Sequence, residues 1–328
     1  MLVLSRGALL AATASLATGV LAGPSVAYAA DTSTPLSAAE MSAELKAVGA
    51  ATAPVASAGW TATIKVTGAS MSGSEFFVVD PVAGTAFERY DFDGDTMALY
   101  AVAGKGRYVS ADDPESRAAL KMMHRSSVRY VFTADRSVKL DDEIGDASPA
   151  TVLTDNVDHA GAKTVHDDGS AEYRFMPGKE TVTVHVTAAG VLASVEDLDS
   201  DGVHATLTYA YGPQHVTLPS AGVTIGSAAM DVGLAYLDMA TSVKWVAGEA
   251  ATDALRAAHG HKISVSSVRK VTRGDARAFN AGVRVQMIKT KSVGGGVRLY
   301  ATNPWTHRTV TYTLEPSGRR ITIAHTGN

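Results

Sequence analysis

Alternation of apolar and polar residues predicts most elements in the first two-thirds of the chain. In residues 181–187, valines alternate strictly with threonines and a histidine, and residues 61–67 place Ala62, Ile64 and Val66 on one face. This period of two is typical of strands with one buried face. Further strands are expected at 75–79, 85–91, 96–102, 107–110, 171–175, 191–195, 204–211 and 215–218. Turn-forming pairs such as Asp201-Gly202 separate the segments, which indicates hairpins of one antiparallel sheet.

Two helices are expected among these strands. Ser37 and Glu40 match a capping box and precede apolar residues at helical spacing, which predicts a helix over 37–49. Residues 113–123 begin with Asp-Pro-Glu, a favourable helix start, and predict the second helix. The segment 31–35, ahead of the first helix, is expected to be a linker.

The pattern changes near residues 219–226. Apolar residues at helical spacing then predict helices at 230–237 and around 250–258. Strands are expected again at 282–288, 296–301, 308–314 and 319–324. We therefore expect a signal peptide (1–29), a first domain (30–222) and a second, smaller α+β domain (223–328).

Charge is divided between these two parts. Residues 30–225 hold 14 Lys and Arg against 27 Asp and Glu, a net charge of −13, whereas residues 226–328 hold 14 against 6, a net charge of +8. Such a division indicates either a partner for the basic part or attraction between the two parts. Outside the cell, that partner would be the anionic envelope surface or an acidic or membrane protein rather than a nucleic acid.

The N-terminus carries the features of a cleavable export signal. Arg6 precedes the apolar run 7–22, which is shorter than the roughly 20 residues of a spanning helix, and an A-x-A site ends at Ala29. Pro24 stands where a lipoprotein box requires cysteine, so no lipid anchor is expected. We expect a secreted, extracytoplasmic protein, and the Ala-, Val-, Thr- and Gly-rich composition is typical of actinobacterial exported proteins.

No motif predicts catalysis, a metal or a cofactor, so a non-enzymatic protein is expected. The chain has no cysteine, which excludes thiol nucleophiles, and it contains neither H-E-x-x-H nor G-x-S-x-G. Residues 197–202 match the first half of a calcium loop, but Thr208 stands where a bidentate Glu is needed, which favours a plain hairpin turn. His185 and His204 lie on the threonine faces of their strands and are expected to face solvent.

The order of elements resembles the LolA-like lipoprotein-carrier superfamily, particularly actinobacterial exported members akin to the LprG and LppX lipoproteins. The resemblance rests on the helix at 37–48 before the strand 61–67, on Val-Val-Asp-Pro at 78–81 and on the ending 201–219. It covers about residues 36–220 and implies a curved antiparallel half-barrel whose concave side, partly closed by helices, can hold acyl chains. Pro24 and the basic C-terminal part depart from this pattern.

The expected fold class is therefore α+β, a half-barrel sheet with covering helices plus a smaller basic domain. Its apolar strand faces would form a trough that binds an acyl lipid or another hydrophobic ligand by burial. The candidate trough residues are Ile64, Val66, Tyr173, Phe175, Val182, Val184, Val186, Leu207 and Tyr209. Two other functions stay open. One is an extracytoplasmic sensor resembling RseB, which pairs such a domain with a smaller one, and the other is a wall-associated interaction protein.

Overall fold

The computed structural model describes residues 31–68, 71–154 and 158–326. The chain forms two compact units. Among the described residues, the first unit comprises those up to Ser110 together with those in 133–218, and the second comprises residues 111–132 and 219–326. The segment 111–132, which lies inside the expected first domain, thus groups with the C-terminal part.

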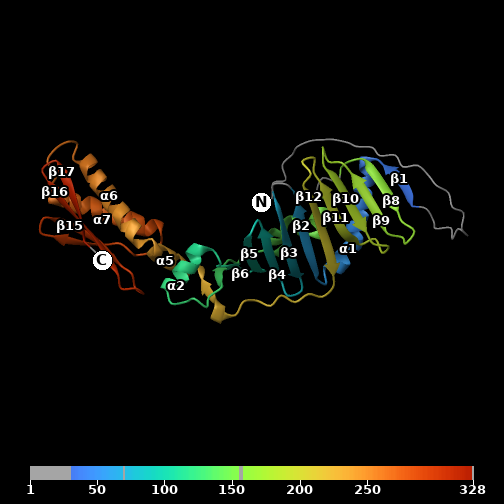
Figure 1. Cartoon of the computed structure of the whole chain (residues 1–328), viewed down its shortest axis with the longest axis horizontal. Helices are drawn as coiled ribbons and strands as arrows, with labels where there is room; N and C mark the ends of the chain where they lie inside the picture. Colours follow the sequence, from blue (N-terminus) through green and yellow to red (C-terminus); the bar gives the residue numbers. More distant parts are fainter. Residues whose placement is uncertain (1–30, 69–70, 155–157, 327–328) are drawn as a thin grey trace, which may run out of the picture. The chain divides into compact units, whose positions relative to one another are not determined.

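The first unit is built on a large curved antiparallel sheet (Figure 1). Its strands follow the order β1-β8-β9-β10-β11-β12-β2-β3-β4-β5-β6. Their bounds are β1 (Thr32–Leu36), β2 (Trp60–Thr67), β3 (Ser72–Asp80), β4 (Thr85–Phe92), β5 (Asp95–Val102), β6 (Gly106–Ser110), β8 (Gly161–Val165), β9 (Ala171–Phe175), β10 (Thr181–Val186), β11 (Leu192–Leu198) and β12 (His204–Tyr211). The mixed α+β class with a curved antiparallel sheet, expected from the sequence, is confirmed.

Helices cover one face of this sheet, which we call the inner face; the opposite face is the outer face. The helices are α1 (Ala38–Ala56), α3 (Leu140–Ile144), the 3-10 turn η1 (Gly145–Ala147) and α4 (Pro149–Val152). Met41, Leu45 and Val48 of α1 are buried among inner-face side chains. Strand alternation explains why the apolar side chains gather on the inner face, because every second residue of each strand points to the same face.

Helix α1 is longer than expected. The capping box is present, since the Ser37 backbone N–H donates to Glu40 Oε2 and the Glu40 N–H donates to Ser37 Oγ. The expected end at Gly49 is wrong, because the helix continues to Ala56. Buried Thr52 anchors the additional turns, as its Oγ1 donates to Val48 O and accepts from the backbone N–H of Leu192 on β11.

Two further expectations for the first unit are wrong. The expected linker 31–35 is mostly strand β1, which pairs with β8 from Thr32 to Leu36. Residues 215–218, expected to be a strand, belong to no strand or helix, although Val216 is buried between exposed neighbours. Both errors concern backbone pairing, which depends on a partner segment distant in the sequence.

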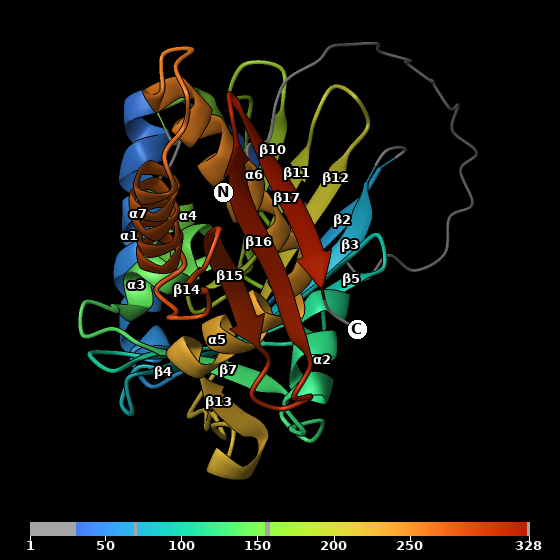
Figure 2. The same cartoon turned by 90° about the vertical axis from the view of Figure 1, so that its left-hand side faces the viewer.

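The second unit consists of helices packed on a four-stranded sheet of order β14-β15-β16-β17 (Figure 2). Its elements are α2 (Pro114–Met122), the 3-10 turn η2 (Ala221–Val223), β13 (Thr224–Gly226), α5 (Ser227–Leu237), α6 (Met239–Ala257), α7 (Val265–Gly282), β14 (Lys289–Val293), β15 (Gly296–Thr302), β16 (Thr309–Ser317) and β17 (Arg320–Thr326). Strand β7 (Tyr130–Ala134) pairs in parallel with β13. Helices α6 and α7 lie side by side and contact the sheet, and α2 contacts α5.

The expected strand at 282–288 is wrong, because Gly282 ends α7, residues 283–288 are irregular chain and the strand begins only at Lys289. Val285 and Met287 are buried, which explains the misleading alternation. The Asn280 side chain takes the place of a neighbouring strand: its Nδ2 donates to Ile288 O and its Oδ1 accepts from the Ile288 N–H.

The expected signal segment 1–29 lies outside the described residues. Within the described ranges, no helix combines the length and apolar character that crossing a membrane requires.

Candidate functional site

A continuous row of side chains crosses the middle of the inner face. The strand register pairs Val184 with Val195, Val195 with Leu207, Leu207 with Ile64, and Ile64 with Glu75. Five neighbouring strands, β10, β11, β12, β2 and β3, therefore contribute to one line of residues, which we call the central row. The row is apolar from Val184 to Ile64 and becomes acidic at Glu75.

All nine trough candidates fall on the inner face, as their alternation predicted. Most of them are core residues, however, because the chain's own helices and strands cover them. Six are only 2–8% exposed: Val66, Tyr173, Phe175, Val184, Val186 and Tyr209. Ile64, Val182 and Leu207 are partly exposed and pack at the margin of the core. Their role in ligand binding stays a prediction, and these three are the accessible part of the predicted trough.

The hydroxyl groups of two buried tyrosines form hydrogen bonds with the helical segments that cover the sheet. The Tyr209 hydroxyl donates to Ala147 O at 3.0 Å, and the Tyr173 hydroxyl donates to Glu44 Oε2 of α1 at 2.9 Å. Burial raises the pKa of both hydroxyls, so both are protonated at neutral pH. These bonds fasten the covering helices to the sheet.

A hollow of about 330 Å³ opens beside α1, at the end of the sheet that β8, β9 and β10 form. Two of the nine candidates, Tyr173 and Val186, reach it. The ion pair between Lys163 Nζ and Glu44 Oε2, at 2.8 Å, lies in its wall and lowers the pKa of Glu44. The hollow therefore combines an apolar floor with one fixed pair of opposite charges.

Two glutamates on the inner face were missed by the sequence patterns. Glu75 of β3 is 8% exposed, and Glu88 of β4 lies one step along on the neighbouring strand, opposite Phe77. Burial, together with the neighbouring Glu88 carboxyl, raises the pKa of Glu75 to about 8, and burial also raises the pKa of Glu88. The two carboxyls thus hold at least one proton at pH 7. Glutamate on the core face of a strand is the signal that would have identified them.

An ion pair lies beside these acids. Arg107 of β6 donates through Nε to Glu143 Oε2 at 2.6 Å and through Nη2 to Glu143 Oε1 at 2.5 Å, a two-bond geometry that fixes α3 over the sheet. The charge of Glu143 contributes to the raised pKa of Glu88. The inner face therefore has a titratable side, on β3, β4 and β6, and an apolar side.

The acidic segment 197–202 forms a hairpin turn, as expected from its incomplete calcium pattern. Asp199 Oδ1 accepts from the backbone N–H groups of Asp201 and Val203, both within 3.0 Å, so its carboxylate serves the turn. Asp197 points to the inner face, where it pairs in register with Val182. Burial and the nearby Glu180 and Asp199 raise the pKa of Asp197 to about 6.

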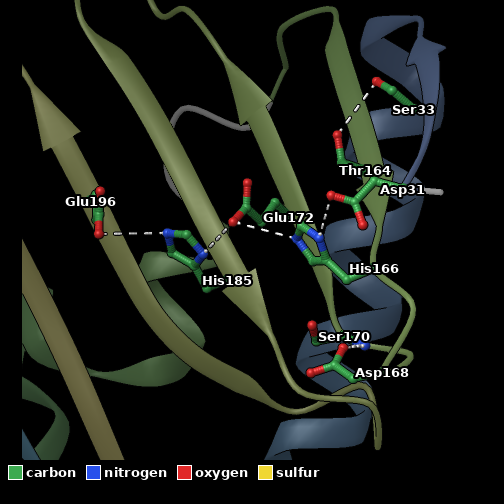
Figure 3. A network of polar contacts seen from close by, with 9 residues as sticks. All are labelled: Asp31, Ser33, Thr164, His166, Asp168, Ser170, Glu172, His185 and Glu196. Atoms are coloured by element: carbon green, nitrogen blue, oxygen red, sulfur yellow. Dashed lines mark hydrogen bonds and ion pairs between the residues drawn. The ribbon is translucent and has the colours of Figure 1, made fainter. Parts of the chain in front are cut away.

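The outer face carries a polar ladder that crosses six strands or their ends, and Figure 3 shows it from Asp31 to Glu196. Its members alternate between carboxylates and imidazoles: Asp31, His166, Glu172, His185, Glu196 and His204. His185 and His204, expected to face solvent, lie on this partly exposed face. Glu172 Oε1 lies 3.2 Å from His185 Nδ1 and 3.5 Å from His166 Nε2, and it joins the two imidazoles.

One histidine of the ladder, His166, has a raised pKa. Asp31 Oδ2 lies 3.1 Å from His166 Nδ1, and this contact, with the charge of Glu172, raises the pKa of His166. The ladder is a chain of pairwise contacts rather than a chelating site. In the described part of the chain, no group of three or more His, Asp or Glu side chains could hold a metal ion.

Comparison with known proteins gives no family assignment. No protein family profile matches the chain, and no curated protein matches it. Among solved structures, MucB in complex with the periplasmic part of MucA aligns at 10% identity and a TM-score of 0.28, covering 84% of this chain and 74% of that one. The Pseudomonas aeruginosa MucA/MucB complex aligns at 10% identity and 0.27, covering 84% and 80%, and MucB alone at 9% and 0.24, covering 88% and 94%. TM-scores this low do not establish a shared fold.

Proposed function

We propose that this chain is a non-enzymatic, extracytoplasmic binding protein whose first unit holds an acyl chain or a similar hydrophobic ligand against the inner face. The observation that carries the proposal is the central row. Its apolar members Val195, Leu207 and Ile64 lie side by side on three neighbouring strands and are partly exposed, whereas Val184 and Glu75 at the two ends of the row are buried.

The dimensions of the row suit one hydrocarbon chain. Three strands about 4.8 Å apart give a strip about 10 Å wide. Each methylene buried contributes about 0.8 kcal/mol, so about eight methylenes would supply about 6 kcal/mol before the cost of association. Binding of this kind needs shape and apolar surface, and it needs no directional polar group.

The polar neighbours of the row favour an uncharged ligand segment. Glu75 follows Ile64 in the row and retains its proton at neutral pH, which limits the negative charge next to the apolar strip. Asp197, with a pKa raised to about 6, ionises at a lower pH and marks the opposite margin near Val182. We infer that an acyl chain enters between these two acids.

Native mass spectrometry of the protein purified from its own culture medium, before and after solvent extraction, tests the proposal directly. A co-purifying mass of lipid size that extraction removes is the expected result. Binding of a fluorescent fatty-acid probe then reports the site. Leu207→Asn should weaken probe binding at least tenfold, whereas Thr208→Asn, on the exposed outer face of the same strand, should leave it unchanged.

Leu207→Trp provides a second variant if the asparagine variant is unstable, because a larger apolar residue fills the row without adding a polar group. A protein that carries no lipid and takes up no probe contradicts the proposal. That result would favour the alternative, an extracytoplasmic sensor or regulator that binds another protein, or a protein that binds the cell wall in a salt-dependent manner.

Three parts of the proposal rest on the sequence alone. They are export through a cleaved signal peptide, the absence of a lipid anchor, and the closer resemblance to LprG- and LppX-type proteins. The mass of the secreted protein tests the first two together, because cleavage after Ala29 without lipid addition fixes its value. The basic residues of the C-terminal part would hold the protein at the anionic envelope surface or at an acidic protein partner.

A further inference from the structure

Within the second unit, the C-terminal segment 226–328 concentrates its few acidic side chains along one groove. Residues 226–328 contain six Asp and Glu residues. Five of them line two adjoining hollows beside α6 and α7: Asp231, Asp238, Glu249, Asp253 and Asp275. We call this the acidic groove. Only Glu315 of the six lies elsewhere, so the acidity is localised although this part of the chain carries a net charge of +8.

The walls of the groove are aromatic and apolar. Trp245 of α6 is 57% exposed, and its ring lies 6.0 Å from that of Phe279 on α7. One hollow, of about 490 Å³, contains both rings together with Glu249 and Asp275. The adjoining hollow, of about 400 Å³, shares Phe279 and Val283 with it and extends the groove toward α5. An exposed indole beside carboxylates is a surface suited to cationic side chains.

Two of the cations of α7 form hydrogen bonds with the margin of the sheet. Arg269 donates to Gly296 O and to Val293 O, and Arg273 donates to Ser292 Oγ, so both point toward β14 and β15. At about 100° per residue, Arg273 lies about 160° around the helix from Asp275 and about 120° from Phe279. Helix α7 therefore presents a basic side to the sheet margin and an acidic, aromatic side to the groove.

The carboxylates of the groove repel one another. One oxygen of Asp275, Oδ2, is buried without a hydrogen-bond partner among the described residues. Burial, with the charges of Asp253 and Glu249, raises the pKa of Asp275. Arg256 compensates part of this charge, since its Nη1 contacts Asp253 Oδ1 at 2.5 Å, but that pair is exposed. A cation placed between Glu249 and Asp275 would relieve the remaining repulsion.

From this arrangement we propose that the acidic groove binds a basic polypeptide segment, with a Lys or Arg side chain seated between Trp245, Glu249 and Asp275. The length of the groove argues for a polypeptide rather than a small amine. From Ser242 to Asp253 along α6 the groove spans about 16 Å, at about 1.5 Å per residue. An extended peptide of about five residues covers that distance at about 3.3 Å per residue.

Fluorescence anisotropy with the mature chain tests this docking site. The probe is a labelled nine-residue peptide of alanine with two lysines and one arginine, and the control peptide has glutamate at those three positions. We expect the basic peptide to bind at least tenfold more tightly. The double variant Glu249→Gln/Asp275→Asn should weaken its binding at least tenfold, whereas Glu315→Gln, which removes the acid outside the groove, should change it less than twofold.

Two further measurements keep the test decisive. Trp245→Ala, an exposed position, should weaken basic-peptide binding without lowering the melting temperature. The double variant should melt no lower than the unmodified chain, because it removes repulsion and not a packing contact. Equal affinity for the basic and acidic peptides overturns the proposal. So does self-association of the chain in analytical ultracentrifugation that the double variant abolishes, since the occupant would then be a second copy.

Discussion

Replacing Glu75 by glutamine should remove a pH-dependent loss of stability from the first unit. The carboxyl is 8% exposed, and burial with the neighbouring Glu88 raises its pKa from 4.5 to about 8. In the unfolded chain Glu75 ionises near pH 4.5, but in the folded chain it keeps its proton up to about pH 8. Its contribution to stability is therefore fully present below pH 4.5 and is lost as the pH rises through 8.

The magnitude follows from the shift. At about 1.4 kcal/mol per pKa unit, the rise corresponds to an upper value of about 5 kcal/mol. Glu88 is only half-buried, so solvent screens part of the interaction, and we expect a loss of about 2–3 kcal/mol in the free energy of unfolding between pH 5 and pH 8.5. The difference between the parent chain and Glu75→Gln reports the contribution of the Glu75–Glu88 pair, because the remaining titrating groups are common to both.

Urea unfolding at pH 5 and pH 8.5 measures the effect. Replacing Trp245 and Trp305 by phenylalanine leaves Trp60, which is buried in the first unit, as the fluorescent reporter. Glu75→Gln should have the stability of the parent chain at pH 5 and exceed it at pH 8.5. Asp91→Asn, an exposed change on β4, should keep the parent's pH dependence. A Glu75→Gln chain with the parent's dependence, or with lower stability at both pH values, would refute the reasoning.

Three further outcomes are expected. Val184→Asp places a carboxylate at a 2% exposed core position and should cost the first unit at least 3 kcal/mol or prevent its folding, as urea unfolding would show. Thr52→Val leaves the buried N–H of Leu192 without its acceptor and should cost about 1–3 kcal/mol by the same measurement, with Thr52→Ser recovering most of the loss. Asp31→Asn should lower the pKa of His166 toward 6.5 in an NMR titration, and an unchanged value contradicts the contact.

The nine predicted trough residues show what the alternation of apolar and polar residues can predict and what it cannot. Alternation placed them correctly on one face of the sheet, since a strand sends successive side chains to opposite sides. It did not separate the core position Val184 from the partly exposed Leu207, because both are apolar residues at alternate positions. That separation depends on where α1, α3 and α4 lie over the sheet. The same limit hid Glu75, whose neighbours are fixed by pairing with β2 and β4.

Helix α7 and the residues after it show a second limit of predicting structure from hydrophobic patterns. Its buried residues Val268, Thr272, Ala276 and Asn280 recur at helical spacing, but two of the four are polar, so a search for apolar residues alone did not find the helix. The following residues alternate like a strand, yet Val285 and Met287 are buried in irregular chain that Asn280 holds by two hydrogen bonds. A side-chain amide that replaces a strand partner leaves no periodic trace in the sequence.

By itself, the sequence determined the α+β class, the faces of most strands, the capping box of α1 and the division of charge, because each depends on neighbours along the chain. Tertiary structure alone decided which apolar residues stay accessible, which carboxyls keep a proton and which acids share a groove. Those properties depend on burial and on distances between segments remote in sequence. Glu75 and Asp275 acquire their chemistry only when the folded chain removes water and brings like charges together.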